Sequence, residues 1–368
     1  MIIKNGIVFQ EDKTFAKRDV YIEDGRIAAN LSRVRDMTEI DASDLYVLPG
    51  FVDIHSHGAV GYDFSDGNMD GLREILKYEY AHGVTSYCPT SMTVEKEKLL
   101  EIFHAMKNRQ DEKDMAHVVG INMEGPFLDA SKKGAHREEC ILAPDVDFFR
   151  KCNELCGNRI RLVTLAPNME GAMKFIDELK NETVISLGHS GADYDTAKAA
   201  LNAGACHVTH LYNAMNPLGH RAPGLIAAAA EKEGCVAELI CDGIHVHESM
   251  VRAAFKLFPG RIALISDSMR ATGMENGTYD LGGQQVTVNG RLATLSDGTI
   301  AGSVTNVFDG MRNAVSFGIP LEEAIAAVTI TPAKSIGIFD EVGSITPGKR
   351  ADVIFVDQKL NLIRVLDI

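Results

Sequence analysis

Two histidines at the end of an apolar stretch are the first residues in this sequence that could do chemistry. The segment 47–58 reads Val-Leu-Pro-Gly-Phe-Val-Asp-Ile-His-Ser-His-Gly, and its apolar run leads directly to His55 and His57. Side chains at positions i and i+2 of a β-strand point to the same face. The two imidazoles would therefore converge beyond a strand and form half of a transition-metal site. Because a His-x-His pair alone is weak evidence, the rest of the chain must supply further ligands.

Other side chains of the ligand type stand where further apolar runs end. Glu124 follows Ile121-Asn-Met and precedes Gly-Pro, and an unpartnered carboxylate is costly to bury. His189, His210 and Asp267 occupy similar positions after later apolar runs. A helix cap, a salt bridge or a satisfied core residue would explain any one of them singly. Together with the histidine pair, they supply enough nitrogen and oxygen ligands for one or two divalent metal ions.

The elements that must position these residues form an alternating pattern of apolar strands and helical segments, which is typical of a parallel α/β fold. The predicted strands are Leu48–His55, Val84–Pro89, Val118–Met123, Ile160–Leu165, Val184–Leu187, His207–Leu211, Val236–Cys241 and Ile262–Ser266. A (β/α)8 barrel of the TIM type would gather their carboxyl ends at one face, where such barrels hold their sites. On the sixth strand, His207 and His210 have opposite parity and should not face the same way. We expect His210 at the site because it stands at the strand end, and His207 in a structural position.

Both ends of the chain are rich in short β-type runs. Hairpin signals occur at Asn5-Gly6 and Asp24-Gly25, and neither end is long enough to form a stable sheet alone. We therefore predict a small β-sandwich domain from residues 1–47 plus 342–368, with the barrel formed by residues 48–341. Repeated Asn-Gly, Gly-Gly and Asp-Gly pairs predict a β-hairpin insertion at about residues 275–303.

Composition restricts the class of protein. Of the 368 residues, 45% are hydrophobic and 24% are charged, as in ordinary globular proteins. The formal net charge of −14 argues against nucleic acid as a partner. No apolar run approaches a membrane span, and the N-terminus lacks the layout of a signal peptide, so we expect a cytoplasmic protein without membrane contact. The seven scattered cysteines are expected to be free thiols in a reducing compartment.

The motifs around these residues resemble the amidohydrolase superfamily, and within it the deacetylases that act on phosphorylated amino sugars. The resemblance covers essentially the whole chain. It is carried by Pro49-Gly-Phe-Val-Asp-Ile-His-Ser-His-Gly58, Asn122-Met-Glu-Gly-Pro-Phe127, Gly134-Ala-His136, Leu187-Gly-His-Ser190, Thr209-His-Leu-Tyr-Asn-Ala-Met-Asn216, Arg221-Ala-Pro-Gly224, Asp242-Gly-Ile-His245 and Ser266-Asp-Ser268.

The resemblance implies a metal-dependent hydrolysis of an acetamide. It implies one or two divalent metal ions per chain, with Zn expected first and Fe, Mn or Co as alternatives. The implied ligands are Glu124, His189 and His210 for the metal common to the family, and His55 and His57 for a second metal. Asp267 would act as general base and then as general acid on a metal-activated water, and His136 would stabilise the oxyanion.

The implied substrate is a small phosphorylated amino sugar. The substrate-binding residues carried over by resemblance are Ala135, Asn213, Ala214, Arg221, Asp242, His245, Ile300, Ala301 and Gly302. The planar guanidinium of Arg221 is suited to phosphate oxygens. In the family, a homodimer places part of the phosphate site across the interface, so we expect a homodimer. We interpret Lys132-Lys133 as a solvated loop tip, with attraction of the phosphate as the alternative because the pair lies near His136. We do not assign His245-Val-His247 as a second metal pair.

Two other functions stay open at this point. The first is another hydrolase of the same superfamily, a cyclic amidase or a deaminase, which would share the first histidine motif and Asp267. The second is a non-catalytic scaffold that keeps the barrel without the chemistry. A substrate panel separates the first from a deacetylase, and a metal count separates the second.

Overall fold

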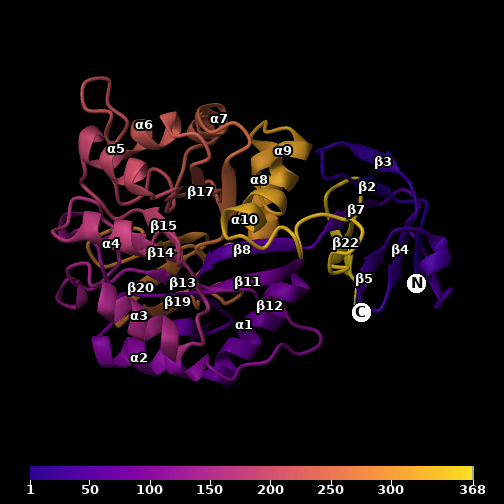
Figure 1. Ribbon diagram of the computed structural model, residues 1–368, viewed down its shortest axis with the longest axis horizontal. Coiled ribbons are helices and arrows are strands. Elements are labelled where there is room, and N and C mark those ends of the chain that lie inside the picture. Colours follow the sequence, from indigo (N-terminus) through magenta and orange to yellow (C-terminus); the bar gives the residue numbers. More distant parts are fainter. Residues whose placement is uncertain (367–368) are drawn as a thin grey trace.

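The computed structural model describes residues 1–366 as a parallel barrel with a small group of β-sheets beside it (Figure 1). Neighbouring barrel strands pair in the order β8, β11, β13, β14, β15, β16, β17 and β18, and a short β12 also pairs with β11. Their bounds are β8 Phe51–Ser56, β11 Val84–Ser91, β12 His117–Val118, β13 Ile121–Glu124, β14 Ile160–Leu165, β15 Val184–Leu187, β16 His207–Val208, β17 Val236–Ile240 and β18 Ile262–Ile265. The ring closes where the Asp267 N–H donates to the His55 carbonyl over 2.9 Å. The predicted (β/α)8 architecture is confirmed.

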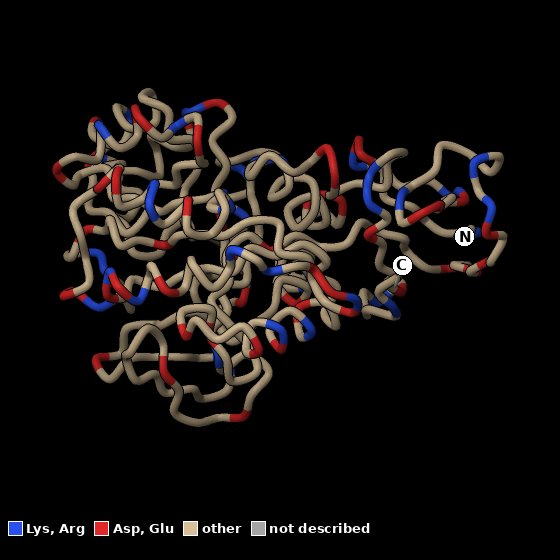
Figure 2. Tube along the Cα trace, turned by 60° about the horizontal axis from the view of Figure 1, so that its bottom comes forward, with Lys and Arg blue, Asp and Glu red and all other residues tan. Residues whose placement is uncertain are grey.

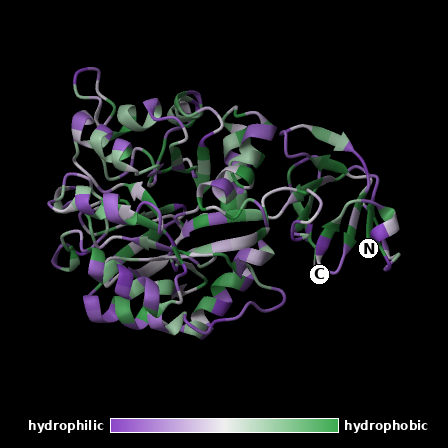
Figure 3. Cartoon of the chain, viewed as in Figure 1, coloured by the Kyte–Doolittle hydropathy of each residue, from purple (hydrophilic) through white to green (hydrophobic). Residues whose placement is uncertain are grey.

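Helices lie around the barrel strands and bury one face each. Their bounds are α1 Met69–Ala81, α2 Lys96–Ala105, α3 Val146–Leu155, α4 Ala172–Leu179, α5 Tyr194–Ala203, α6 Gly224–Glu231, α7 Glu248–Leu257, α8 Val307–Ser316, α9 Leu321–Ala326 and α10 Ile330–Ser335. In α1, the Asn68 side chain caps the first turn by accepting from Asp70 N–H and Gly71 N–H. Leu72 and Ile75 of α1 lie on the buried face. Hydrophilic and hydrophobic positions accordingly alternate along the outer helices (Figure 3).

The small β-rich domain combines the two ends of the chain. One sheet has the order β23-β22-β7-β2-β3, and the other has the order β5-β4-β1-β6. Their bounds are β1 Ile2–Lys4, β2 Ile7–Phe9, β3 Phe15–Lys17, β4 Val20–Glu23, β5 Arg26–Ala28, β6 Glu39–Asp41, β7 Tyr46–Pro49, β22 Val353–Val356 and β23 Leu362–Val365. A separate core that includes Val8, Val47 and Phe355 lies between them. The predicted domain extends to Ile368, and residues 367–368 lie outside the described residues. The domain bounds stay a prediction.

The first predicted strand, Leu48–His55, is two strands in the structure. β7 pairs with β2 and β22 in the small domain, whereas β8 pairs with β11 in the barrel. Gly50 separates them and donates its N–H to the Asp352 carbonyl over 2.9 Å. A Cβ at Gly50 would lie 2.2 Å from Thr85 Oγ1, so this crossing has room only for glycine. An apolar run alone does not show such a change of sheet.

The sixth predicted strand, His207–Leu211, is also shorter than expected. β16 ends at Val208 because the backbone turns into left-handed conformations, with φ values of 25° at His210, 78° at Tyr212 and 51° at Ala214. His210 therefore reaches the site from a turn and not from a strand. We expected His210 at the site because of its place at the strand end. Its Nε2 does lie beside Glu124, although the residue lies beyond the strand.

An antiparallel three-stranded sheet lies between β18 and α8, where hairpins are predicted. It contains β19 Gly277–Leu281, β20 Gln284–Asn289 and β21 Leu292–Thr294. The Gln284 side chain donates to the Ala135 carbonyl. This contact joins the inserted sheet to the loop that follows β13. A shorter strand pair, β9 Gly58–Ala59 and β10 Tyr62–Asp63, follows β8. The 3-10 helices are η1 Leu31–Arg33, η2 Phe64–Asp66, η3 Ala130–Lys132 and η4 Glu138–Cys140.

Acidic and basic residues are interspersed along the whole chain, as Figure 2 shows. Most of the ion pairs, such as Arg150–Glu182, involve partly exposed side chains, which contribute little to stability. Among residues 1–366, each helix is too short or too polar to traverse a lipid bilayer.

We predict that Gly50→Ala destabilises the protein by about 1–3 kcal/mol, because the new methyl group overlaps Thr85. The matched control is Gly310→Ala within α8, where an added Cβ would have no neighbour within 4 Å. That change should stabilise the protein by roughly 0.5–1 kcal/mol, since alanine favours helix. Urea unfolding measures both, and equal effects of the two substitutions would contradict the close crossing at Gly50.

Candidate active site

Glu124 is the hub of the site at the carboxyl ends of the barrel strands. Its carboxylate is buried at the end of β13. Oε1 lies 3.1 Å from His189 Nε2, 3.0 Å from His210 Nε2 and 3.4 Å from His55 Nε2. The two nitrogens of His189 and His210 are themselves only 3.0 Å apart. One carboxylate oxygen therefore faces three imidazoles, one from β8 and two from the turns that follow β15 and β16.

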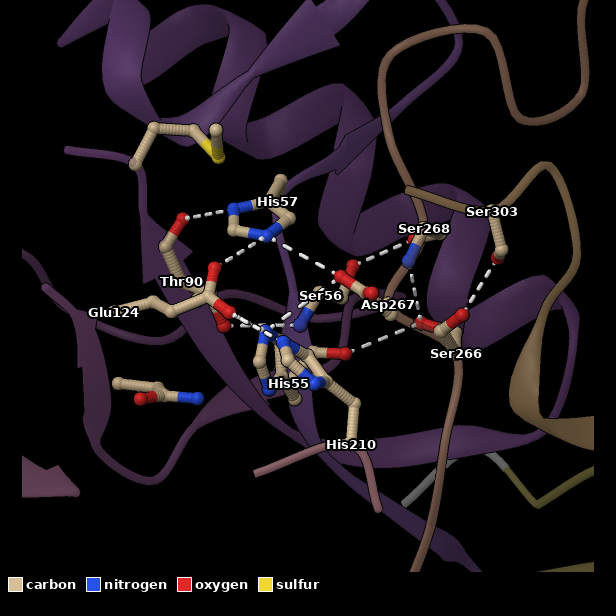
Figure 4. Close-up of polar contacts among 12 residues, drawn as sticks. His55, Ser56, His57, Thr90, Glu124, His210, Ser266, Asp267, Ser268 and Ser303 are labelled. Carbon is tan, nitrogen blue, oxygen red and sulfur yellow. Dashed lines mark hydrogen bonds and ion pairs between the residues drawn. The ribbon is translucent and has the colours of Figure 1, made fainter. Parts of the chain in front are cut away.

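The second oxygen of Glu124 faces two more imidazoles. Oε2 lies 3.1 Å from His57 Nε2 and 3.3 Å from His136 Nε2. Asp267 approaches from the end of β18, with Oδ1 3.3 Å from His57 Nε2 and 3.6 Å from His55 Nε2 (Figure 4). The barrel thus brings together all seven residues that the sequence predicts for metal binding and catalysis.

Main-chain carbonyls fix the tautomers of two of these histidines. His57 Nδ1 lies 3.1 Å from the Thr90 carbonyl, and His189 Nδ1 lies 2.9 Å from the Lys132 carbonyl. A carbonyl only accepts hydrogen bonds, so each Nδ1 carries the hydrogen. The Nε2 atoms of His57 and His189 are therefore directed toward the cluster, as metal ligation requires.

The carboxylate of Glu238 fixes the tautomer of His55 in the same way. Its Nδ1 lies 2.9 Å from Glu238 Oε2, while its Nε2 is buried without a hydrogen-bond partner. The Nδ1 of His210 is likewise buried without a partner. A buried polar atom without a partner calls for an explanation such as an ion or a water molecule. The cluster therefore has the donor set of a divalent metal centre, with Nε2 atoms and a carboxylate within reach of one another.

His136 differs from the other four histidines. Its Nδ1 accepts a hydrogen bond from the Thr93 N–H over 3.2 Å. The hydrogen of a neutral imidazole must then sit on Nε2, which faces Glu124. The ligand atoms of His55, His57 and Glu124 lie close enough together to hold a metal ion, and so do those of Glu124, His136 and His189. The tautomer makes His136 a hydrogen-bond donor toward the cavity and disfavours it as a ligand.

The buried charged groups strongly shift one another's pKa values. Burial by itself lowers the pKa of His57, but hydrogen bonds to Asp267 and Glu124 outweigh burial and raise that pKa to about 10. Burial by itself raises the pKa of Asp267, but the His57 hydrogen bond and the nearby imidazoles lower it to about 2. Burial together with the neighbouring His136 lowers the pKa of His189 to about 4, against the opposing effect of Glu124. Asp267 is therefore ionised at neutral pH.

Three of the cluster residues have left-handed backbones. The φ values are 45° at His189, 25° at His210 and 47° at Asp267. Such conformations are unfavourable for residues other than glycine and concentrate at functional sites. Each one turns the chain sharply just after a barrel strand, which directs the side chain across the end of the barrel.

A cavity of about 510 Å³ opens above the cluster. Of the residues predicted to bind substrate, it is lined by Ala135, Asn213, Ala214, His245, Ile300 and Gly302. Asp242 lies behind His245, whose Nδ1 is 2.7 Å from Asp242 Oδ2. Ala301 is buried, and Arg221 is exposed outside the cavity lining.

Sequence reasoning missed several residues of this site. Lys132 and Lys133, which we interpreted as a solvated loop tip, both line the cavity. Asp297 and Thr299 also line it, from the segment that follows β21. Glu238, which contacts His55, was not singled out, although a glutamate inside the apolar run Val-Ala-Glu-Leu-Ile is a signal that could have found it.

Comparisons with known proteins agree with this geometry. Residues 46–366 match the amidohydrolase family. The chain is 39% identical to N-acetylglucosamine-6-phosphate deacetylase of Bacillus subtilis (strain 168), covering 99% of this chain and 94% of that protein. It is 35% identical to N-acetylgalactosamine-6-phosphate deacetylase of Escherichia coli O157:H7, covering 94% and 92%. The fold matches a Mycobacterium smegmatis N-acetyl-D-glucosamine-6-phosphate deacetylase variant in complex with that sugar phosphate, at a TM-score of 0.91, 30% identity and coverage of 100% and 97%.

We predict that Zn²⁺ stabilises the metal-free protein, because a ligand that binds only the folded state adds stability by mass action. At a thousandfold excess over Kd, the gain is about 4 kcal/mol. Glu124→Gln should lose most of this gain, since Glu124 contacts every imidazole of the cluster. Calorimetric Tm with and without Zn²⁺ measures the effect.

The matched control is His247→Asn, which removes an exposed imidazole outside the cluster. Asparagine preserves the N-cap that His247 provides for α7. This variant should show the full Zn²⁺ shift. An equal shift in wild type and Glu124→Gln would exclude the cluster as the metal site.

Proposed function

The chain belongs to the amidohydrolase family, and we propose that it hydrolyses N-acetyl-D-glucosamine 6-phosphate to glucosamine 6-phosphate and acetate. The observation that carries this proposal is the position of Asp267 beside the Glu124–histidine cluster at the base of the cavity. A cavity of about 510 Å³ is within the size range of small-molecule sites. The similarity to deacetylases over nearly the whole chain supports the same reaction.

The cluster is proposed to hold one or two divalent metal ions. Zn is the first choice, and Fe, Mn or Co suit the same nitrogen and oxygen ligands. Glu124, His189 and His210 would hold one ion, and His55 and His57 would hold a second. When bound, such a metal lowers the pKa of a water molecule toward neutrality and polarises a carbonyl.

Asp267 is proposed as the general base and then the general acid. Its low pKa keeps the carboxylate ionised, so it can accept a proton from the attacking water. The same proton is then delivered to the amide nitrogen as the carbon–nitrogen bond breaks, which lets the amine leave. Because the Asp267 N–H is bonded to the His55 carbonyl, the carboxylate stays beside the cluster through both steps.

His136 is proposed to stabilise the oxyanion that forms on the acetyl carbon. The Thr93 N–H occupies its Nδ1, so its Nε2–H is directed toward the cluster. A hydrogen-bond donor in a buried site stabilises developing negative charge strongly, because little reorganisation is needed. His136 is itself almost fully buried, which keeps this donor in place.

The phosphate end of the substrate is proposed to lie toward Asn213, Ala214 and His245 on the cavity wall. Lys132 and Lys133 add positive charge to the same cavity. Arg221 is exposed and outside this cavity, which is compatible with a homodimer in which it reaches the site of the partner subunit.

The related N-acetylgalactosamine 6-phosphate, which differs in the configuration of one hydroxyl group, is the second candidate substrate. The relative from Escherichia coli O157:H7 favours it, because it is 35% identical and carries that name. Since the substrates are sugar phosphates, we propose that the reaction takes place in the cytoplasm. A substrate panel that includes both sugars, a cyclic amide and an aminated base separates these candidates from the other hydrolases.

We predict that Asp267→Asn lowers acetate release from N-acetyl-D-glucosamine 6-phosphate by roughly 10²–10⁴-fold, because proton transfer is lost. Metal content should stay at the wild-type level, since the cluster retains Glu124 and its imidazoles. Acetate release and elemental analysis on the same sample measure both quantities. Near-normal turnover of the metal-loaded variant would show that another group transfers the proton. A wild-type protein with neither metal nor turnover would favour the non-catalytic scaffold.

We predict that Arg221→Ala raises KM for the phosphorylated sugar by about 10–100-fold, as expected for a lost charge-assisted hydrogen bond. Unphosphorylated N-acetylglucosamine should be turned over as by wild type. Mixed dimers of the Arg221→Ala and Asp267→Asn variants test whether Arg221 acts across the interface. If it does, one of the two sites in each mixed dimer would contain both Asp267 and the Arg221 of the other subunit, and activity should recover. Equal losses on both sugars, or no recovery in mixed dimers, would contradict this role.

A further inference from the structure

Glu238 is a buried carboxylate for which the reaction described above has no role. It lies at the centre of β17, with apolar neighbours in sequence on both sides. Its side chain is fully buried inside the barrel. Lone carboxylates are rarely buried without a specific partner, because desolvation is costly.

The contacts of Glu238 connect the two halves of the metal cluster. Its Oε2 accepts a hydrogen bond from His55 Nδ1–H at 2.9 Å and another from the His210 N–H at 3.1 Å. His55 belongs to the His-x-His pair from β8, whereas His210 belongs to the group around Glu124 Oε1. One oxygen atom thus fixes the ring of one candidate ligand and the main chain of another.

The other oxygen of Glu238 makes no hydrogen bond. Glu238 Oε1 is buried without a hydrogen-bond partner and lies 3.8 Å from His207 Nδ1. His207 instead contacts Ser186 Oγ at 3.1 Å. The two hydrogen bonds of Oε2 are therefore the ones that hold the carboxylate in its orientation.

We propose that Glu238 is a positioning residue that orients the His55 ring for the second metal ion. This inference rests on the proposed metal-dependent function. A carboxylate behind a ligating imidazole fixes its tautomer and its ring orientation and strengthens it as a ligand. The bond to the His210 N–H also supports the left-handed turn at His210, where φ is 25°.

A structural role alone predicts a different result. If Glu238 only satisfied buried donors, its loss would lower the stability of the whole protein and weaken both metal sites together. If it positions His55, its loss weakens mainly the site that contains His55. The separation of two metal-binding steps therefore distinguishes the two roles.

The test is titration of the metal-free protein with Co²⁺, followed by visible absorption, with total metal counted by elemental analysis. Glu238→Gln keeps an acceptor oxygen and the side-chain shape, but removes the charge. We expect wild type to bind two ions per chain and the variant to bind the ion at His55 and His57 about 10–100-fold more weakly. The other binding step should change by less than about threefold.

Glu238→Asp retains the charge and shortens the side chain, so we expect it to lose the hydrogen bond to His55 Nδ1. We expect the same selective weakening of one step. High Co²⁺ should restore acetate release in both variants, with KM for the substrate unchanged. Added metal also stabilises a folded protein by mass action, so the selective weakening of one binding step, and not this recovery, distinguishes positioning from a structural defect.

Ser186→Ala is the matched control, because Ser186 contacts His207 and Thr209 in the same barrel interior. Both of its metal-binding steps should equal those of wild type. Wild-type affinity of both steps in Glu238→Gln, or equal weakening of both with a lower Tm, would overturn the inference. Wild type that binds no metal would instead overturn the proposed function, and with it the inference.

Discussion

The burial of the Glu124 carboxylate among imidazoles is the interaction on which the rest of this structure depends. An isolated charge in a protein interior is too costly to keep, so its neighbours must compensate it. His55 and His57 add further buried polar groups, and the Nε2 of each lies within 3.6 Å of Asp267 Oδ1. These groups are compatible with a folded interior only when the strand ends meet with accurate register. The folding of the barrel and the formation of the site therefore depend on each other.

Closure of the barrel positions part of the site. The Asp267 N–H bonds to the His55 carbonyl, and the His57 N–H bonds to the Ser268 carbonyl over 2.8 Å, so the last strand end is tied to the first. Hydroxyl contacts reinforce the junction, with Ser56 Oγ 2.7 Å from Ser268 Oγ (Figure 4). The proposed base and the first two candidate ligands are thus held by the same hydrogen bonds that complete the fold.

The surroundings give chemically equal imidazoles different roles. His57 and His189 donate Nδ1–H to carbonyls and direct Nε2 toward the cluster, whereas His136 accepts from a main-chain N–H and presents a donor. Metal binding and oxyanion stabilisation need these opposite forms. The main chain decides between them, because an N–H only donates and a carbonyl only accepts.

The sequence by itself determined the barrel, the joint β-rich domain and the residues at the strand ends, because periodicity and polarity are local properties. It did not show the change of sheet at Gly50 or the early end of β16, since both depend on close contacts and turns between distant segments. Only the tertiary structure gave the tautomers, the placement of Lys132 in the cavity lining and the contacts of Glu238 with His55 and His210. Those features arise from partners far apart in sequence, which hydrophobic pattern and residue spacing do not encode.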